Sequence, residues 1–137
     1  MKYLVYISSA TQLPNQSELL DILAVSRENN KHNNLTGMLL YGEGSFMQLL
    51  EGDADELHKT FKAIEADIRH KNVMIMTEGD IENRIFPDWS MGFKSVNTQE
   101  MKQLSAYVNP KELGLIDAER SNAMINMLKN FSDTNRM

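Results

Sequence analysis

The sequence predicts one α+β domain in which two helices pack on one face of a sheet. Two observations support this prediction. Segments rich in β-branched and aromatic residues alternate with capped helical segments in the order β-α-β-β-α-β-β, and the two middle strands are separated by only Gly42-Glu43-Gly44. The 137 residues are the length of one ordinary domain, and the 42% hydrophobic and 24% charged content excludes disordered and fibrous classes.

The N-terminal half supplies the first strand, the first helix and a hairpin. Residues 2–9, KYLVYISS, contain many β-branched and aromatic side chains without helical spacing, which predicts a strand. Asn15 followed by Glu18 forms a capping-box pattern, so a helix is expected from there to about Asn30, ended by the segment NNKHNN. Residues 35–41 and 45–52 are predicted to form the two strands of the hairpin.

The second helix is the clearest in the sequence. Asp53 with Glu56 repeats the capping pattern. The apolar side of this helix is expected to contain Leu57, Phe61, Ile64 and Ile68. Residues 72–81 and residues 89–96, after the break at Pro87, are predicted strands. Two crossovers around a central hairpin give a ferredoxin-like βαββαβ sheet with both helices on one face and an extra fifth strand.

The last forty or so residues have a helical character. Residues 98–108 and 117–131 show helical patterns separated by NPKELG. Because both helices of the βαββαβ unit lie on one sheet face, these C-terminal helices are expected to cover the other face. We therefore expect a sheet domain over residues 1–96 and a helical extension over residues 97–137 that packs on the sheet.

Composition excludes several classes of function. The balance of 14 Lys and Arg against 19 Asp and Glu gives a net charge of −5, so nucleic acid is not an expected partner. The sequence has no cysteine and no apolar run of about 18 residues, so we expect a cytoplasmic protein without a membrane span. The three histidines lack metal-site spacing, and nucleotide and hydrolase motifs are absent, so we expect neither a metal nor an enzyme.

One predicted strand contains a polar residue among apolar ones. In SFMQLLEG, Phe46, Gln48 and Leu50 point to one face and the apolar residues between them to the other. An unpartnered buried amide costs about 1–3 kcal/mol, so Gln48 needs a partner. The first and third strands of this fold are adjacent, which brings Tyr6, on the same face as Ser8, to Gln48. Either the two residues satisfy each other or they form a polar spot beneath the helices.

Further polar and aromatic residues are expected near the same place. Asn29 and Asn30 end the first helix, where Asn is a common terminator. Other candidates are Asp67, Arg69 and His70 in the sequence DIRH after the second helix, and Trp89 and Met91 on the last strand. Taken singly, each has a structural explanation as a solvated last turn or as core packing.

Taken in order, these residues resemble the BLUF family of blue-light sensors over roughly residues 1–96. The resemblance rests on LVYISS with Tyr6, the Asn29-Asn30 pair, TGMLLY leading into FMQLLEG, DIRH, and WSM. It implies a photoreceptor that holds FAD non-covalently between the two helices. FMN and riboflavin stay open, because Ala63 stands where some relatives have an Arg that would contact the flavin tail.

The resemblance implies a role for each position. The implied cofactor-binding residues are Tyr6, Ser8, Ile22, Asn29, Asn30, Phe46, Gln48, Leu50, Ala63, Ile64, Asp67, Arg69, His70 and Met91, and the implied photoactive residues are Tyr6, Gln48, Trp89 and Met91. Asn30 should bind the flavin C4 carbonyl and N3–H, Arg69 the C2 carbonyl, and Ile22 and Ile64 the two ring faces. Gln48 should bridge Tyr6 and the N5/C4-carbonyl edge, and change its hydrogen bonds after Tyr6 supplies an electron and a proton to the excited flavin.

The expected output is a protein interaction. The residues after Val96 are too few for a cyclase or phosphodiesterase, so we expect a stand-alone sensor that signals to a separate downstream protein and forms a homo-oligomer. The Met-rich C-terminal helix offers an interface for either role. The alternative is a light-insensitive ferredoxin-like module that binds a ligand or a protein, and the colour of the purified protein would distinguish the two.

Overall fold

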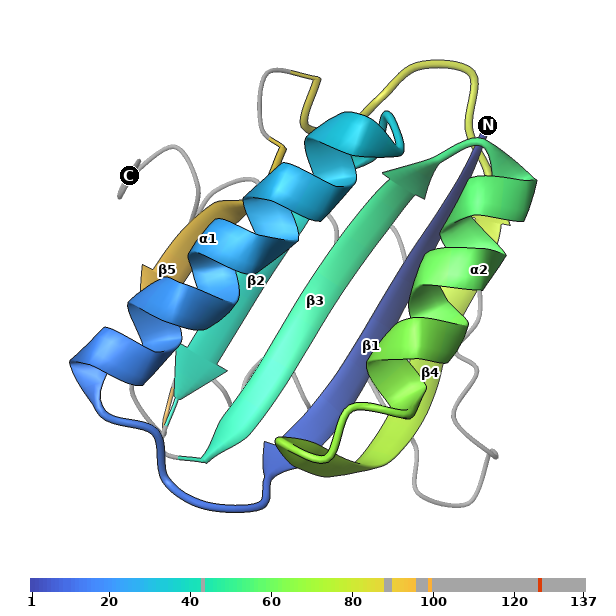
Figure 1. Cartoon of the computed structure of the whole chain (residues 1–137). Coiled ribbons are helices and arrows are strands. Elements are labelled where there is room, and N and C mark those ends of the chain that lie inside the picture. The colour runs from blue at the N-terminus through green and yellow to red at the C-terminus, as the bar shows by residue number, and fades with distance from the viewer. Residues whose placement is uncertain (43, 88–89, 96–98, 100–125, 127–137) are drawn as a thin grey trace.

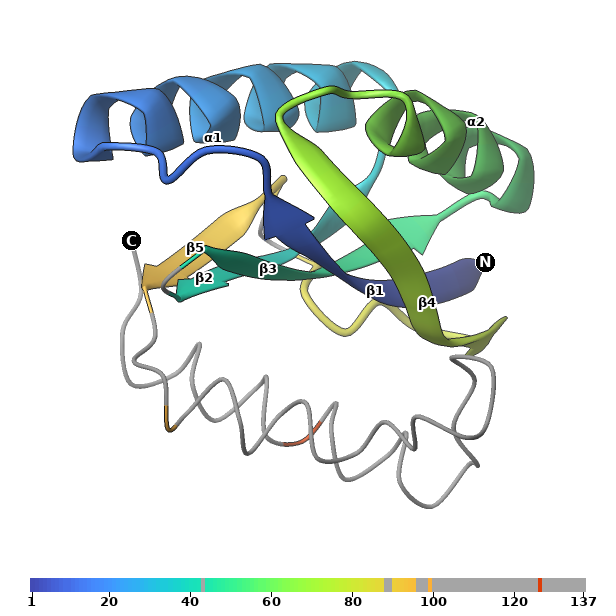
Figure 2. The ribbon, with the colours of Figure 1, turned by 90° about the horizontal axis from the view of Figure 1, so that it is seen from below.

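A computed structural model describes residues 1–42, 44–87, 90–95, 99 and 126 of the chain. Its elements are β1 (Lys2–Ala10), α1 (Gln16–His32), β2 (Thr36–Gly42), β3 (Ser45–Gly52), α2 (Ala54–Glu65), β4 (His70–Asp80) and β5 (Gly92–Ser95). The strands form one sheet in the order β4-β1-β3-β2-β5. Both helices lie on the same face of this sheet (Figures 1 and 2). The predicted ferredoxin-like βαββαβ arrangement is confirmed.

The two central strands, β1 and β3, are antiparallel neighbours. Their register places Tyr6 directly opposite Gln48, so the predicted meeting of these residues is confirmed. At the far edge, β5 pairs in parallel with β2, with Gly92 opposite Met38. This strand lies inside the predicted segment 89–96, whose Trp89 and Val96 are outside the described residues.

The start of α1 forms as the capping box predicts. The Asn15 side chain accepts a hydrogen bond from the Glu18 backbone N–H at 2.9 Å, and the Glu18 carboxylate accepts one from the Asn15 N–H at 3.3 Å. The helix ends at His32, two residues beyond the expected Asn30, and Asn34 then adopts a left-handed φ of 55°. The polar segment NNKHNN therefore ends the helix within its own length.

The end of α2 differs from the prediction. The helix stops at Glu65, and Ile68 is 86% exposed, so the expected place of Ile68 on the buried helix face is wrong. The Asp67 carboxylate accepts the Arg69 backbone N–H at 2.9 Å, and the Ile68 carbonyl accepts the Thr11 hydroxyl at 2.9 Å. These bonds offer the backbone an alternative to a further helical turn.

Apolar side chains are buried on both sheet faces. Beneath the helices, Leu4, Leu23, Leu39, Leu50, Leu57 and Phe61 belong to one core cluster. On the other face, Val5, Met38, Leu40, Met47 and Leu49 are buried as well. The C-terminal helices that we expected to cover this second face lie outside the described residues. Within the part that the structure describes, no helix is long and apolar enough to span a membrane.

Candidate functional site

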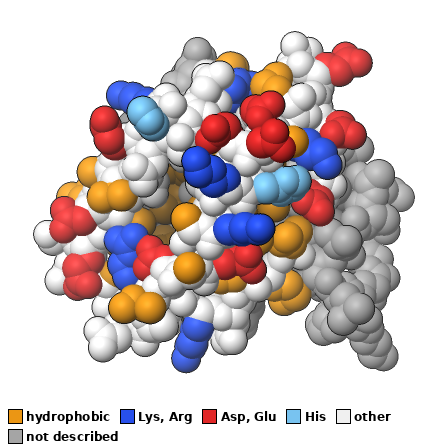
Figure 3. All heavy atoms as spheres, turned by 45° about the vertical axis from the view of Figure 1, so that its right-hand side comes forward, with side chains coloured by type: hydrophobic (Ala, Val, Ile, Leu, Met, Phe, Trp, Pro, Cys, Tyr) orange, Lys and Arg blue, Asp and Glu red, His pale blue; other side chains and the backbone are white. Residues whose placement is uncertain are grey.

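A cavity opens between α1 and α2 above the central strands. The empty space within it, counted together with the open solvent at its mouth, is about 830 Å³. The lining residues are Tyr6, Ile22, Val25, Ser26, Asn29, Asn30, Leu39, Phe46, Gln48, Thr60, Ala63, Ile64, Asp67, Arg69 and His70. On the surface, hydrophobic side chains lie in a hollow with acidic and basic side chains around it (Figure 3).

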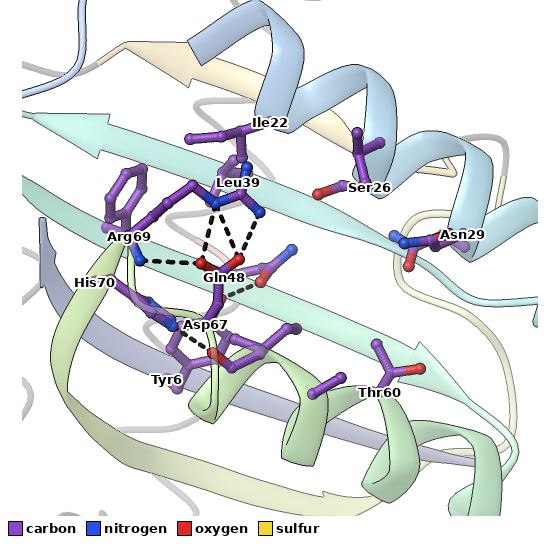
Figure 4. A pocket seen from close by; sticks show the side chains of 15 residues that line it. Tyr6, Ile22, Ser26, Asn29, Leu39, Gln48, Thr60, Asp67, Arg69 and His70 are labelled. Atoms are coloured by element: carbon purple, nitrogen blue, oxygen red, sulfur yellow. Dashed lines mark hydrogen bonds and ion pairs between the residues drawn. The ribbon is translucent and has the colours of Figure 1, made fainter. Parts of the chain in front are cut away.

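The cavity has apolar walls and a partly polar floor. Ile22 on α1 and Ile64 on α2 supply apolar groups from the two helices. At one end of the cavity, Tyr6, Asp67, Arg69 and His70 gather, whereas Ser26 and Asn29 of α1 lie further along it (Figure 4). A flat ligand with apolar faces and a polar edge would match both kinds of surface.

On the floor, the amide of Gln48 uses both of its ends. The Tyr6 hydroxyl donates a hydrogen bond to Gln48 Oε1, and Gln48 Nε2 donates to the Met91 sulfur at 3.4 Å. Tyr6 and Gln48 are only 3% and 4% exposed. Because a thioether sulfur only accepts hydrogen bonds, turning the amide around would place its oxygen against the sulfur. The observed orientation, with the amide oxygen on the phenol and the amide nitrogen on the thioether, therefore satisfies both ends of Gln48.

The phenol of Tyr6 is held in its neutral form. Burial raises the pKa of Tyr6 well above its ordinary value, and the Asp67 carboxylate raises this pKa further. The ring also contacts two neighbours, with centroid distances of 5.6 Å to Phe61 and 6.2 Å to His70. Tyr6 is thus a fixed hydrogen-bond donor at neutral pH.

The helix α1 holds the segment that leads into β5. Asn30, which is 2% exposed, donates from Nδ2 to the Ser90 carbonyl at 2.7 Å. One turn earlier, Arg27 Nε donates to the Met91 carbonyl at 2.9 Å. Met91 is therefore fixed by its backbone to α1 while its side chain contacts Gln48.

The turn after α2 supplies an ion pair and a histidine. Arg69 donates from Nη2 to Asp67 at 2.5 Å and from Nε to both carboxylate oxygens at 3.0 Å. The Arg69 hydrogen bond holds the pKa of the Asp67 carboxyl below its usual range. His70 Nε2 lies 2.5 Å from the Ile64 carbonyl, so this nitrogen donates, and Nδ1 lies 2.8 Å from the Ser8 hydroxyl.

The comparison with protein families identifies the domain. The family described as "Sensors of blue-light using FAD", abbreviated BLUF, matches residues 1–92. The chain belongs to the BLUF family. It is accordingly a blue-light sensor domain that uses a flavin.

Named relatives include BLUF parts of much longer proteins. Photoactivated adenylate cyclase subunit alpha of Euglena gracilis is 31% identical over 93 residues, which are 66% of this chain and 9% of that protein. The blue light- and temperature-regulated antirepressor BluF of Escherichia coli (strain K12) is 28% identical over 71 residues, 52% of this chain and 18% of that protein. The BLUF chain thus spans about a tenth of the cyclase subunits that it matches.

Two solved BLUF-type structures match nearly end to end. The photo-activated state of BlsA is 26% identical with a TM-score of 0.76, covering 93% of this chain and 94% of that one. The dark state of BlrB, titled a BLUF protein, is 27% identical with a TM-score of 0.72, covering 94% and 95%. The sheet and helices described above are therefore the BLUF fold.

Most of the residues that the BLUF resemblance implied come together in the cavity. The lining includes Tyr6, Ile22, Asn29, Asn30, Phe46, Gln48, Ala63, Ile64, Asp67, Arg69 and His70. Ser8 instead contacts His70 behind the lining, and Met91 contacts Gln48. Leu50 is fully buried in the core beneath and is not part of the lining. Trp89 lies outside the described residues.

Four lining residues were not among the predicted BLUF site residues. They are Val25, Ser26, Leu39 and Thr60. Leu39 stands directly opposite Gln48 in the β2–β3 register, so the predicted hairpin could have identified it. The other three lie one helical turn from Ile22 or Ile64, which helical periodicity could have identified.

The residues present fit a flavin. Its ring system has two apolar faces and an edge that alternates carbonyl and N–H groups. The isoleucines supply apolar walls, while the Asn30 amide, the Gln48 amide and the Arg69 guanidinium supply donors and acceptors at the floor and mouth. One of the two N–H groups of Asn30 Nδ2 donates to Ser90, so the second N–H is suited to a carbonyl of a ligand and Oδ1 to an N–H.

Proposed function

We propose that this BLUF domain binds FAD non-covalently between α1 and α2, and that blue light changes the hydrogen bonds of Gln48. The observation that supports this proposal is the Gln48 amide on the cavity floor, with its oxygen on Tyr6 and its nitrogen on the Met91 sulfur. Such an amide can exchange a donor and an acceptor without any change in charge.

Particular residues would hold the flavin. Ile22 and Ile64 would contact the ring faces, Asn30 and Arg69 the carbonyl and N–H edge, and Asn29 and His70 the adjacent wall. A bound flavin supplies the absorption of blue light and, when excited, an acceptor for one electron. The family description supports FAD, and the flavin released from the purified protein can be identified by chromatography.

The residues of the chain then perform the switch. Tyr6 is placed to give up an electron and to pass its proton along the hydrogen bond to Gln48 Oε1. After the electron and the proton return to Tyr6, Gln48 keeps a changed hydrogen-bond arrangement, which it reaches by rotation, tautomerisation or both. Each hydrogen bond is worth about 1 kcal/mol, so the new arrangement must bias a nearly balanced element. Met91, directly before β5, is the residue that such a change would reach.

The test is absorption spectroscopy of the flavin-loaded chain. We expect a reversible red shift under blue light in the wild type. Gln48→Leu should keep bound flavin and lose the shift, whereas Gln16→Leu, an exposed glutamine at the start of α1, should behave as wild type. A normal red shift in Gln48→Leu would refute the role of the amide. A colourless wild-type chain that does not bind added flavin would favour the light-insensitive module.

We also propose a stand-alone cytoplasmic sensor, without enzyme activity, that signals to a separate protein. Residues 1–96 would form the flavin domain and residues 97–137 an extension packed on the sheet. The near end-to-end likeness to BlrB and BlsA supports this organisation. We propose a homo-oligomer as well. Light scattering in the dark and after illumination measures its mass, and a value of only 15.7 kDa, the mass of one chain, would contradict the proposal.

A further inference from the structure

We propose that Glu51 is a positioning residue for the light response, because its carboxylate fixes the connection between β4 and β5 that presents Met91 to Gln48. This inference rests on the proposed function, since it concerns the Met91 contact of the same switch. Glu51 is the next-to-last residue of β3 and is fully buried, at 0% exposure. A buried carboxylate is costly unless its oxygens are hydrogen-bonded.

The partners of Glu51 come from the connection itself. Oε1 accepts the Ile85 backbone N–H at 2.6 Å, and Oε2 accepts the Phe86 backbone N–H at 2.7 Å. Oε2 also accepts the Thr36 hydroxyl at 2.8 Å. Bonds to an ionised carboxylate are about twice as strong as neutral ones, so this is a firm attachment of the chain between β4 and β5 to the central sheet.

Arg84 strengthens the same attachment. Its guanidinium donates to the Thr36 hydroxyl at 2.8 Å, to the Glu51 backbone carbonyl at 3.2 Å and to the Asn34 carbonyl at 2.7 Å. The cation therefore lies beside the buried anion without bonding to the carboxylate, and Thr36 bridges the two. Five hydrogen bonds thus join residues 84–86 to the β2–β3 hairpin and to Asn34, two residues before it.

The connection is held at two places, near its middle and directly before β5. Glu51 holds it at Ile85 and Phe86, while α1 holds it at Ser90 and Met91 through Asn30 and Arg27. Gln48 and Glu51 stand three positions apart on β3, so their side chains point to opposite faces of the sheet. One strand therefore carries both the amide that changes and the carboxylate that anchors the segment contacting it.

The hydrogen bonds at residues 84–86 and at Ser90 and Met91 limit how Met91 can move when Gln48 changes. If the amide presents its oxygen to the Met91 sulfur, two acceptors face each other, and Met91 must either move or destabilise the lit state. With residues 84–86 anchored, movement of Met91 is directed into β5, which pairs with β2. Weakening the anchor would let Met91 withdraw, relieve the repulsion and prolong the lit state.

Glu51→Gln in the full flavin-loaded chain tests the proposal. The side chain keeps its size, but an NH₂ group now faces backbone donors. We expect flavin binding and the red shift to persist, dark recovery to slow by about threefold or more, and the light-induced change in the Met91 methyl NMR signal to shrink. That signal can be assigned by its loss in Met91→Leu.

Two further variants make the test decisive. Glu82→Gln changes an exposed carboxylate on the same connection and should leave recovery unchanged. Thr36→Val removes the hydroxyl that donates to Glu51 and accepts from Arg84, but it leaves both backbone N–H bonds to the carboxylate. It should therefore slow recovery less than Glu51→Gln, and it keeps the proposal testable if Glu51→Gln does not fold. Unchanged recovery and an unchanged Met91 signal in the folded variants would overturn the role of Glu51. A wild-type chain without a red shift would instead overturn the proposed function.

Discussion

At the level of single residues, the site depends on a phenol and an amide that face each other across two strands. Tyr6 on β1 and Gln48 on β3 are paired in register, and both are almost fully buried. Each would be costly to bury alone, and together they satisfy one another. The same bond that stabilises the folded chain is therefore the one that the light reaction would use.

Removing the Tyr6 hydroxyl should affect both stability and photochemistry. In Tyr6→Phe, Gln48 Oε1 loses its donor, which should cost about 1–3 kcal/mol of unfolding free energy. The red-shifted product should also be absent, because the electron and proton donor is gone. Urea unfolding and difference spectra measure the two effects. Tyr3→Phe, on the same strand but the opposite face, is the control, and a normal red shift in Tyr6→Phe would exclude Tyr6 as the donor.

The buried phenol also predicts a loss of stability in alkali. The pKa of Tyr6 is raised above the ordinary 10.0 in the folded state, so the unfolded chain releases this proton first as the pH rises. The contribution of Tyr6 is therefore complete below about pH 10 and declines above it. Unfolding free energies measured between about pH 8 and 11 should fall less steeply in Tyr6→Phe, and equal slopes would contradict the raised pKa.

Among the elements, the hairpin of β2 and β3 leaves no room for a side chain at Gly37. A Cβ added at Gly37 would lie 2.0 Å from the Leu49 backbone oxygen. Gly37→Ala should therefore force the two strands apart and cost about 1–3 kcal/mol or more. Gly79→Ala, on the edge strand β4, would meet the Tyr3 side chain at 3.1 Å, and this neighbour can move. Denaturant unfolding should show the larger loss for Gly37→Ala.

The elements that could be predicted from sequence are those set by neighbouring residues. The Asn15 capping box and the pairing that closes the hairpin between Gly42 and Ser45 act locally, and both are present where the pattern placed them. The end of α2 was missed because Asp67 and Thr11 bind the backbone there. Of these, Thr11 is far away in the sequence.

The candidate site shows the same division between local and distant causes. The meeting of Tyr6 and Gln48 followed from strand alternation and topology, while roles such as those of Asn30 and Arg69 came from the family resemblance. Glu51 was not predicted, because a charged residue at a strand end is usually solvated. Its burial depends on backbone N–H groups 34 and 35 positions further along the chain.

On the scale of the whole molecule, the cavity lies between helices that contact the sheet and leave space between them. Ile22 and Ile64 face this space from α1 and α2, so a ligand there would complete the packing of both helices. Filling the cavity is therefore expected to stabilise the entire domain and not only the site.

Flavin should accordingly raise the melting temperature of the chain. A ligand present at a hundred times its dissociation constant adds about 2.7 kcal/mol to the stability of the folded state. FAD, FMN and riboflavin should give similar gains at equal concentration, because the lining residues would contact the ring that the three share. Differential scanning fluorimetry would measure the shift, and adenosine monophosphate is the control. No shift with any flavin would contradict the assignment of the cavity.

The antiparallel pairing of β1 and β3 has a practical consequence for refolding work. If either strand slipped by one position, phenol and amide would end on opposite faces of the sheet. Molecules paired in the wrong register could not show the spectral response, however compact they were. The fraction of flavin-loaded molecules that show the red shift after a flash would thus report the fraction with correctly aligned strands. Illumination would serve as an assay of strand alignment.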